Sequence, residues 1–137
     1  MAVAIKSIVG VLLKGDLYQI IEKTNGDKQW RKNGQLHREG DLPAFEGANG
    51  DRSWWLDGKR SRGNGLPAFE GVNGDKHWMV DGQLHREDGL PAIVRTNGHK
   101  SWWVNGVLHR NKKPAIVNQI FNAWYTNGQY QRRIQIN

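Results

Sequence analysis

The chain has 137 residues, enough for one domain with a modest core, and its lack of cysteine excludes disulfides, thiolate metal sites and a cysteine nucleophile. Seven of the 20 Lys and Arg lie in residues 89–137, where none of the 13 Asp and Glu occurs. Residues 1–88 therefore hold 13 side chains of each sign, and the net charge of +7 belongs to the last third. A net positive charge that is concentrated at one end of a chain bears on the partners of the protein and not on its fold.

Residues 1–13 form an apolar run that is interrupted by Lys6 and is too short to cross a bilayer. No small-residue cleavage site precedes Gly15, so we expect a strand or short helix that starts the fold and not a signal peptide. Residues 1–17 are predicted to be a capping strand, and no membrane span is expected elsewhere.

The rest of the chain repeats itself every 24 residues. Arginines and turn glycines keep the same period, as do Pro43, Pro67 and Pro91, and the tryptophans that mark it are Trp30, Trp54, Trp78 and Trp102. A fixed period of this length indicates a repeat array. We expect about five units, at residues 18–38, 39–62, 63–86, 87–110 and 111–137, of which the last is the most diverged and the most basic.

Nine of the eleven Asn-Gly or Asp-Gly pairs lie between short apolar runs. Both pairs accept the positive φ angles of hairpin turns, so the predicted fold is all-β: a meander of short antiparallel strands without helix. Strand alternation places Trp54 and Leu56 on one face, with the Trp column as the packed seam. Trp55 and Trp103 then face the other side, either as an exposed aromatic surface or buried by a curl of the sheet.

The segment Trp103-Val-Asn-Gly-Val-Leu-His109 resembles the MORN repeat, in which an aromatic residue, an Asn/Asp-Gly turn and a His recur. The segment from Arg86 to Ala92 departs from that family after the His and is similar to MORN-like repeats of phages and giant viruses. The resemblance implies an elongated antiparallel sheet that acts as a scaffold or binding surface, with lipid binding proposed for some members. It also implies a viral protein in the host cytoplasm or the virion.

The recurring histidines and arginines are predicted to be structural. Equivalent positions of neighbouring units lie roughly 10–14 Å apart if each unit adds two or three strands, too far for His37, His85 and His109 to share a metal. Arg38 and Arg86 either pair with the acid that follows each of them, Glu39 and Glu87, or donate to loop carbonyls, whereas the role of Arg110 stays open. No nucleophile or carboxylate recurs around the histidines, so we expect neither an enzyme nor a cofactor.

The candidate binding residues combine positive charge with aromatic rings near the C-terminus: Lys100, Trp103, Arg110, Lys112, Lys113, Trp124, Tyr125, Tyr130, Arg132 and Arg133. The leading hypothesis is an acidic protein partner, either a virion protein or a host defence protein. Nucleic acid is the second candidate, because phosphates take charge and bases stack on rings. Glycan binding through Trp55 and Trp103 is the third. Self-association through an open last strand, residues 129–136, is a further possibility.

Overall fold

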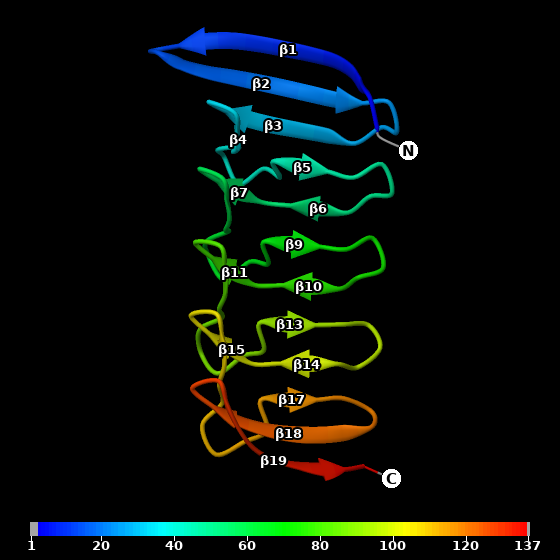
Figure 1. Ribbon diagram of the computed structural model, residues 1–137, viewed down its shortest axis with the longest axis vertical. Helices are drawn as coiled ribbons and strands as arrows, with labels where there is room; N and C mark the ends of the chain where they lie inside the picture. The colour runs from blue at the N-terminus through cyan, green and yellow to red at the C-terminus, as the bar shows by residue number, and fades with distance from the viewer. Residues whose placement is uncertain (1–2, 137) are drawn as a thin grey trace.

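The computed structural model describes residues 3–136, so residues 1, 2 and 137 of the predicted terminal segments lie outside it. The described residues form strands and turns without a helix, which confirms the all-β prediction. One antiparallel sheet contains 13 strands, and three two-stranded hairpins stand apart from it. In Figure 1 the strands of the large sheet follow one another along the long axis, and the small hairpins line up along one side.

The large sheet keeps the order of the chain except where it skips the side hairpins. Its strands are, in spatial order, β1 (Ile5–Leu13), β2 (Asp16–Lys23), β3 (Lys28–Lys32), β5 (Phe45–Glu46), β6 (Arg52–Ser53), β9 (Phe69–Glu70), β10 (Lys76–His77), β13 (Ile93–Val94), β14 (Lys100–Ser101), β17 (Ile116–Val117), β18 (Phe121–Thr126) and β19 (Gln129–Gln135). β4 (Gln35–Leu36) pairs with β3. The side hairpins are β7 (Trp55–Leu56) with β8 (Lys59–Arg60), β11 (Met79–Val80) with β12 (Gln83–Leu84), and β15 (Trp103–Val104) with β16 (Val107–Leu108).

Each 24-residue step advances the large sheet by two strands, as from β5 and β6 to β9 and β10. At a strand spacing of about 4.8 Å, equivalent residues of successive steps lie roughly 10 Å apart. This is the shorter end of the predicted range, and it still separates the recurring histidines by far more than a shared metal allows.

The nine Asn-Gly and Asp-Gly pairs that lie between the apolar runs form two kinds of turn. In five of them both residues have positive φ, as in Asp57 (48°) and Gly58 (76°), which is the type I′ geometry. In the other four the Gly alone has positive φ. There the loop holds three residues: Gly50 donates to the carbonyl of Gly47, and the Asn49 side chain accepts the backbone N–H of Asp51. The Asx contact keeps the Asn in its ordinary conformation, and Gly takes the left-handed position.

The chain bends out of the large sheet at each repeated tryptophan. β6 ends at Ser53 and β7 begins at Trp55, so Trp54 is the corner between them. Trp54 is 5% exposed, whereas Leu56, predicted on the same face, is 44% exposed. The expected alternation is therefore wrong beyond the corner, because the two residues lie in different sheets. The Trp column itself is buried at its three later positions, and Trp30 is half-buried.

The core is a line along the array, built from the Trp corners and from alanines that are fully buried: Ala44, Ala68, Ala92 and Ala115. Ala68 shows the connection, since its carbonyl accepts the N–H of Trp54 and its own N–H donates to His77 of the next strand. A larger side chain at these fully buried positions would have to displace its neighbours, which favours Ala in every unit.

Candidate functional site

Each repeated arginine stacks on the tryptophan eight residues before it. The guanidinium carbon lies 3.6 Å from the Trp78 ring centroid in Arg86 and 3.7 Å from that of Trp102 in Arg110. The same guanidinium donates to a proline carbonyl, from Arg86 to Pro91 at 3.0 Å. Arg38, Arg62 and Arg110 make the equivalent pair of contacts. Arg110, whose role the sequence left open, is therefore engaged in the same way as its counterparts.

The acids that follow Arg38 and Arg86 do not contact them. Glu39 and Glu87 lie against the neighbouring histidines, with 3.4 Å from His37 Nε2 to Glu39 and 2.7 Å from His85 Nε2 to Glu87. Of the two alternatives for Arg38 and Arg86, donation to a loop carbonyl is found and pairing with the adjacent acid is not, because the arginine turns inward over the indole while the acid stays at the surface.

The recurring histidines join one unit to the turn of the next. Nδ1 of His37, His85 and His109 accepts the backbone N–H of Asp57, Asn105 and Asn127, at 3.0 to 3.1 Å. At the fourth position Ser61 Oγ accepts the N–H of Asp81. Since Nδ1 is the acceptor, Nε2 carries the proton in the neutral ring, and in His37 and His85 it can donate to the carboxylate beside it. A serine can replace a histidine here because the position requires only an acceptor.

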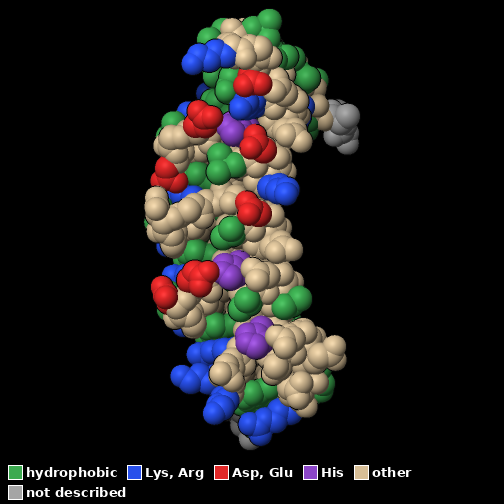
Figure 2. Space-filling view, turned by 90° about the vertical axis from the view of Figure 1, so that its left-hand side faces the viewer, with side chains coloured by type: hydrophobic (Ala, Val, Ile, Leu, Met, Phe, Trp, Pro, Cys, Tyr) green, Lys and Arg blue, Asp and Glu red, His purple; other side chains and the backbone are tan. Residues whose placement is uncertain are grey.

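Positive charge gathers at the C-terminal end of the molecule, as the sequence predicts. Figure 2 shows Lys and Arg side chains together at that end of the visible face, whereas Asp and Glu side chains lie along the rest of it. Within the described residues 3–136, no carboxylate lies within 4 Å of any basic nitrogen from Arg95 onward, whereas Lys6, Lys32, Arg52 and Arg62 all have ion-pair partners. We call the predicted set of binding residues, from Lys100 to Arg133, the basic end.

Most aromatic rings of the basic end are half-buried, and a guanidinium group lies over one of them. Arg132 lies over Trp124, 4.3 Å from the ring centroid, and Arg133 lies 5.0 Å from that of Phe121, a ring that the sequence did not single out. Tyr125 and Tyr130 meet edge to face at 5.6 Å. Tyr130 is the exception, since 59% of its surface is exposed. At the C-terminal end of the molecule Arg132 and Arg133 thus form a layer of cations above Trp124 and Phe121, and Tyr130 is largely exposed.

The predicted binding residues do not all lie on one element or one side. Lys100 belongs to β14 in the large sheet, where it pairs with Val94 and Val117. Trp103 begins the side hairpin β15–β16, beyond the bend at Trp102. Lys112 and Lys113 are exposed in the loop before β17, and Arg132 and Arg133 are exposed in β19. Lys112 and Lys113 make no ion pair or cation–π contact within residues 3–136, whereas Arg132 and Arg133 each lie over an aromatic ring.

Trp55 and Trp103 are half-buried, between the two alternatives that the sequence left open. Their indole N–H groups donate to Ser53 Oγ at 2.7 Å and to Ser101 Oγ at 2.8 Å. Arg60 lies over the Trp55 ring at 4.9 Å from its centroid. The indole N–H groups of both rings therefore have hydrogen-bond partners within the protein, and one face of the Trp55 ring is covered by Arg60.

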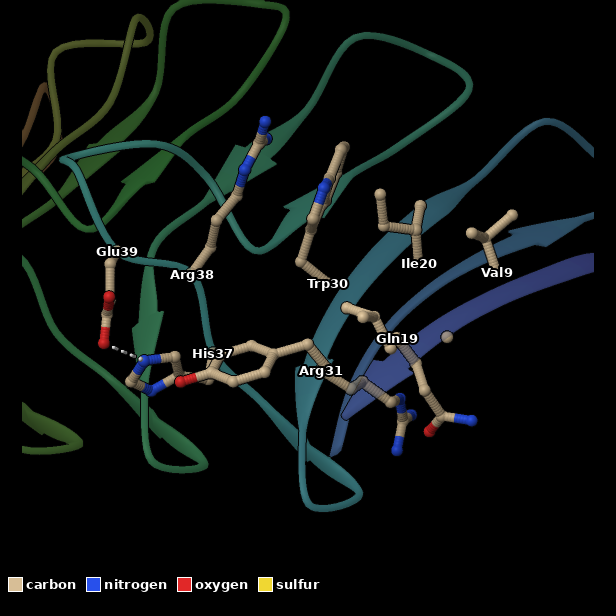
Figure 3. Close-up of a pocket in the computed structure, with 11 residues that line it drawn as sticks. Val9, Gln19, Ile20, Trp30, Arg31, His37, Arg38 and Glu39 are labelled. Atoms are coloured by element: carbon tan, nitrogen blue, oxygen red, sulfur yellow. Dashed lines mark hydrogen bonds and ion pairs between the residues drawn. The ribbon is translucent and has the colours of Figure 1, made fainter. Parts of the chain in front are cut away.

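Shallow hollows recur along the array beside the Trp corners, and the sequence did not predict them. The first, of about 310 Å³, is lined by Val9, Val11, Ile20, Trp30 and Arg38 among others. Figure 3 shows the side chains of Val9, Ile20, Trp30 and Arg38 in a row, with His37 turned toward Glu39. Three others contain a Trp corner and the preceding Arg loop. The first differs because β1 and β2 stand where the later hollows have a loop.

The surroundings of His77 and His99 disfavour their charged forms. Burial is the main cause that lowers the pKa of His77, and the positive charges of Arg95 and Arg60 lower it further. Burial, followed by Arg95, also lowers the pKa of His99. The lowered pKa values of His77 and His99 favour the uncharged form of both rings.

Comparison of the chain with protein-family models, with curated protein sequences and with solved structures finds no match in any of the three. Residues 3–136 include no helix long and apolar enough to cross a membrane.

Proposed function

We propose that this chain is a MORN-like viral repeat protein of about five units, without enzymatic activity, whose basic end binds an acidic surface of a protein partner. The partner is either a structural protein of the particle or a host defence protein. The observation that carries the proposal is the unpaired charge: seven Lys and Arg from Arg95 to Arg133 have no carboxylate within 4 Å in residues 3–136, and residues 89–137 contain no acid.

The way the cations are held favours a folded acidic surface. The Arg132 side chain is stacked on Trp124, so its guanidinium loses less conformational freedom when it binds a carboxylate. Fixed guanidinium groups match carboxylates in two-point contacts, and aromatic and Arg residues are the usual anchors of protein interfaces. Lys112 and Lys113, in the exposed loop, add charge that steers an acidic partner toward this end.

Direct nucleic-acid binding is the second candidate and uses the same charges. Binding of single strands depends on ring faces on which bases stack. Here Arg132 and Arg133 occupy ring faces of Trp124 and Phe121, and Tyr130 is the aromatic side chain of the set that remains largely exposed. The cationic layer thus supplies phosphate contacts with little stacking, which favours the acidic protein over the single strand.

The test is a Trp-fluorescence titration with a polyglutamate peptide and with mixed-sequence single- and double-stranded oligonucleotides, at low and physiological salt. The variant K112E/K113E reverses two exposed charges at the basic end. The matched control is K14E/K59E, which reverses two exposed charges within residues 1–88, where acidic and basic side chains are equal in number. We expect polyglutamate binding that K112E/K113E abolishes and K14E/K59E retains. Oligonucleotide binding that survives physiological salt and is lost in the same variant would replace the proposal with the second candidate.

A further inference from the structure

The first strand is an open edge of the large sheet. All nine residues of β1 are exposed, with Val9 at 65% and Leu12 at 70%, and in Figure 1 β1 is the outermost strand at the N-terminal end. Its single strand partner within residues 3–136 is β2. The N–H and C=O groups on its outer side therefore form an unpaired row next to apolar side chains, which is a template for another strand.

β1 lacks the features that usually protect such an edge. Residues 7–13 contain no charge and no proline, and the single register shift lies between Ile5 and Ser7 at the start of the strand. The opposite edge of the same sheet is different, since β19 carries Arg132 and Arg133 in its middle. A charged edge resists pairing with a copy of itself, whereas an uncharged apolar edge does not.

The pairing of β1 with β2 decides which groups point outward. The N–H of Asn33 donates to the carbonyl of Leu17, so the backbone of Leu17 faces β3 and not β1. Leu12, the partner of Leu17, therefore directs its own N–H and C=O away from β2. Because these directions alternate along an antiparallel pair, Ile8 and Gly10 share the outward orientation of Leu12.

Three outward-facing residues with Gly10 at their centre match a second copy of the same strand. A two-fold axis through Gly10 pairs Gly10 with its own copy and Ile8 with Leu12 of the other chain, each as a hydrogen-bonded pair. Val9 then lies directly opposite Val11 of the other chain. Every cross-strand contact between residues 8 and 12 is apolar, and no like charges are opposed.

The side chains beside this edge extend the contact. Val9 and Val11 form the rim of the first hollow, whose inner wall is Ile20 and Trp30 (Figure 3). Pairing through β1 brings Val11 of the second chain beside this hollow, and the apolar row from Trp30 to Val9 continues across the junction. The later hollows have no such continuation because they are bounded by loops.

We propose that two copies of this chain associate through antiparallel pairing of β1 with β1, which makes one continuous sheet with the two basic ends at its far tips. The occupant of the open edge is thus a second copy of the protein. This assembly presents two copies of the basic end to a partner, although the pairing itself does not depend on the function proposed for that end.

Sedimentation across a concentration series tests the association. We expect a monomer–dimer equilibrium that stops at the dimer. V9K/V11K places lysines opposite one another and should weaken association by at least about tenfold. I134K adds a charge to the opposite edge strand, at a residue that is 49% exposed, and should leave association unchanged. A monomer at every concentration, growth beyond the dimer, or loss of association in I134K with retention in V9K/V11K would overturn the proposal.

Disulfide cross-linking tests the register without adding charge, since the chain has no cysteine of its own. In the proposed pairing Val9 and Val11 of opposite chains lie about 4.5 Å apart at Cα, within the reach of a disulfide. Val9 and its own copy are diagonal neighbours at about 7–8 Å. An equimolar mixture of V9C and V11C should therefore cross-link readily, and V9C alone far less. Equal cross-linking of V9C alone and of the mixture would contradict the register, as would none in either.

Discussion

Replacing Arg86 by methionine removes one guanidinium from the repeated Arg–Trp stack and leaves a side chain long enough to cover Trp78. Two contacts are lost: the 3.6 Å approach to the ring and the 3.0 Å hydrogen bond to the Pro91 carbonyl. A hydrogen bond from a charged donor contributes about 1.5–3 kcal/mol, and a partly desolvated cation–π contact about 1–2 kcal/mol. One group makes both contacts, so their sum overestimates the loss, and methionine keeps part of the packing. We expect R86M to lower the free energy of unfolding by about 2–3 kcal/mol.

The assay is urea unfolding followed by circular dichroism, with R132M as the matched control. Arg132 stacks on Trp124 at 4.3 Å in an exposed strand, and no hydrogen bond of its guanidinium is found within residues 3–136. Its loss should therefore cost about 0.5–1 kcal/mol. R86K should recover little of the difference, because an ammonium cannot stack in plane while it donates sideways. The reasoning fails if R86M lies within about 0.5 kcal/mol of the parent, or if R132M costs as much as R86M.

Three further perturbations test the core, the turns and the buried histidine. A68V adds two methyl groups at a fully buried position and should cost about 1–3 kcal/mol, whereas V72A, at a residue that is 65% exposed, should change stability little in the same thermal scan. G74A should destabilise the protein more than G89A does in urea unfolding. Both glycines have positive φ, but a Cβ at Gly74 would lie 3.0 Å from Thr96 Cγ2, whereas one at Gly89 would meet nothing within 4 Å. Equal losses of stability in the two variants would contradict this prediction. The pKa of His77 is lowered from 6.5 on folding, so the unfolded chain takes up the proton at a higher pH than the folded one. The contribution of His77 to the free energy of unfolding should therefore be complete above about pH 6.5 and fall as the pH drops from there through the folded pKa. If H77F shows the same dependence of stability on pH as the parent, His77 is not its cause.

Much of the fold could be predicted because residues with strong local preferences recur with the 24-residue period. Asn-Gly and Asp-Gly mark most of the hairpins, and the recurring Trp marks the buried column, as in Trp54 and Trp78. The type of turn was less accessible. Asn49 and Asp57 both precede Gly, and the difference between them depends on the Asp51 N–H that the Asn49 side chain accepts.

The sequence predicted which residue types make up the candidate site, but it did not predict how their side chains contact one another. The concentration of Lys and Arg after residue 89 is a property of the sequence, and the charges do gather at one end. The sequence carries no signal that Arg132 covers Trp124 or that Glu87 turns to His85 and not to Arg86. Those contacts depend on which side chains the folded backbone brings within reach of one another.

The sequence alone determined the strands, the hairpins, the spacing of the array and the position of its charge. These follow from contacts within a unit or between neighbouring units, which a repeat array makes in the same way each time. The tertiary structure decided the bend at each Trp corner and the cover of the aromatic rings. It also decided the contrast between the uncharged edge at β1 and the charged edge at β19. An edge exists only relative to the strands that lie beside it, and no periodic pattern states which strand is left without a neighbour.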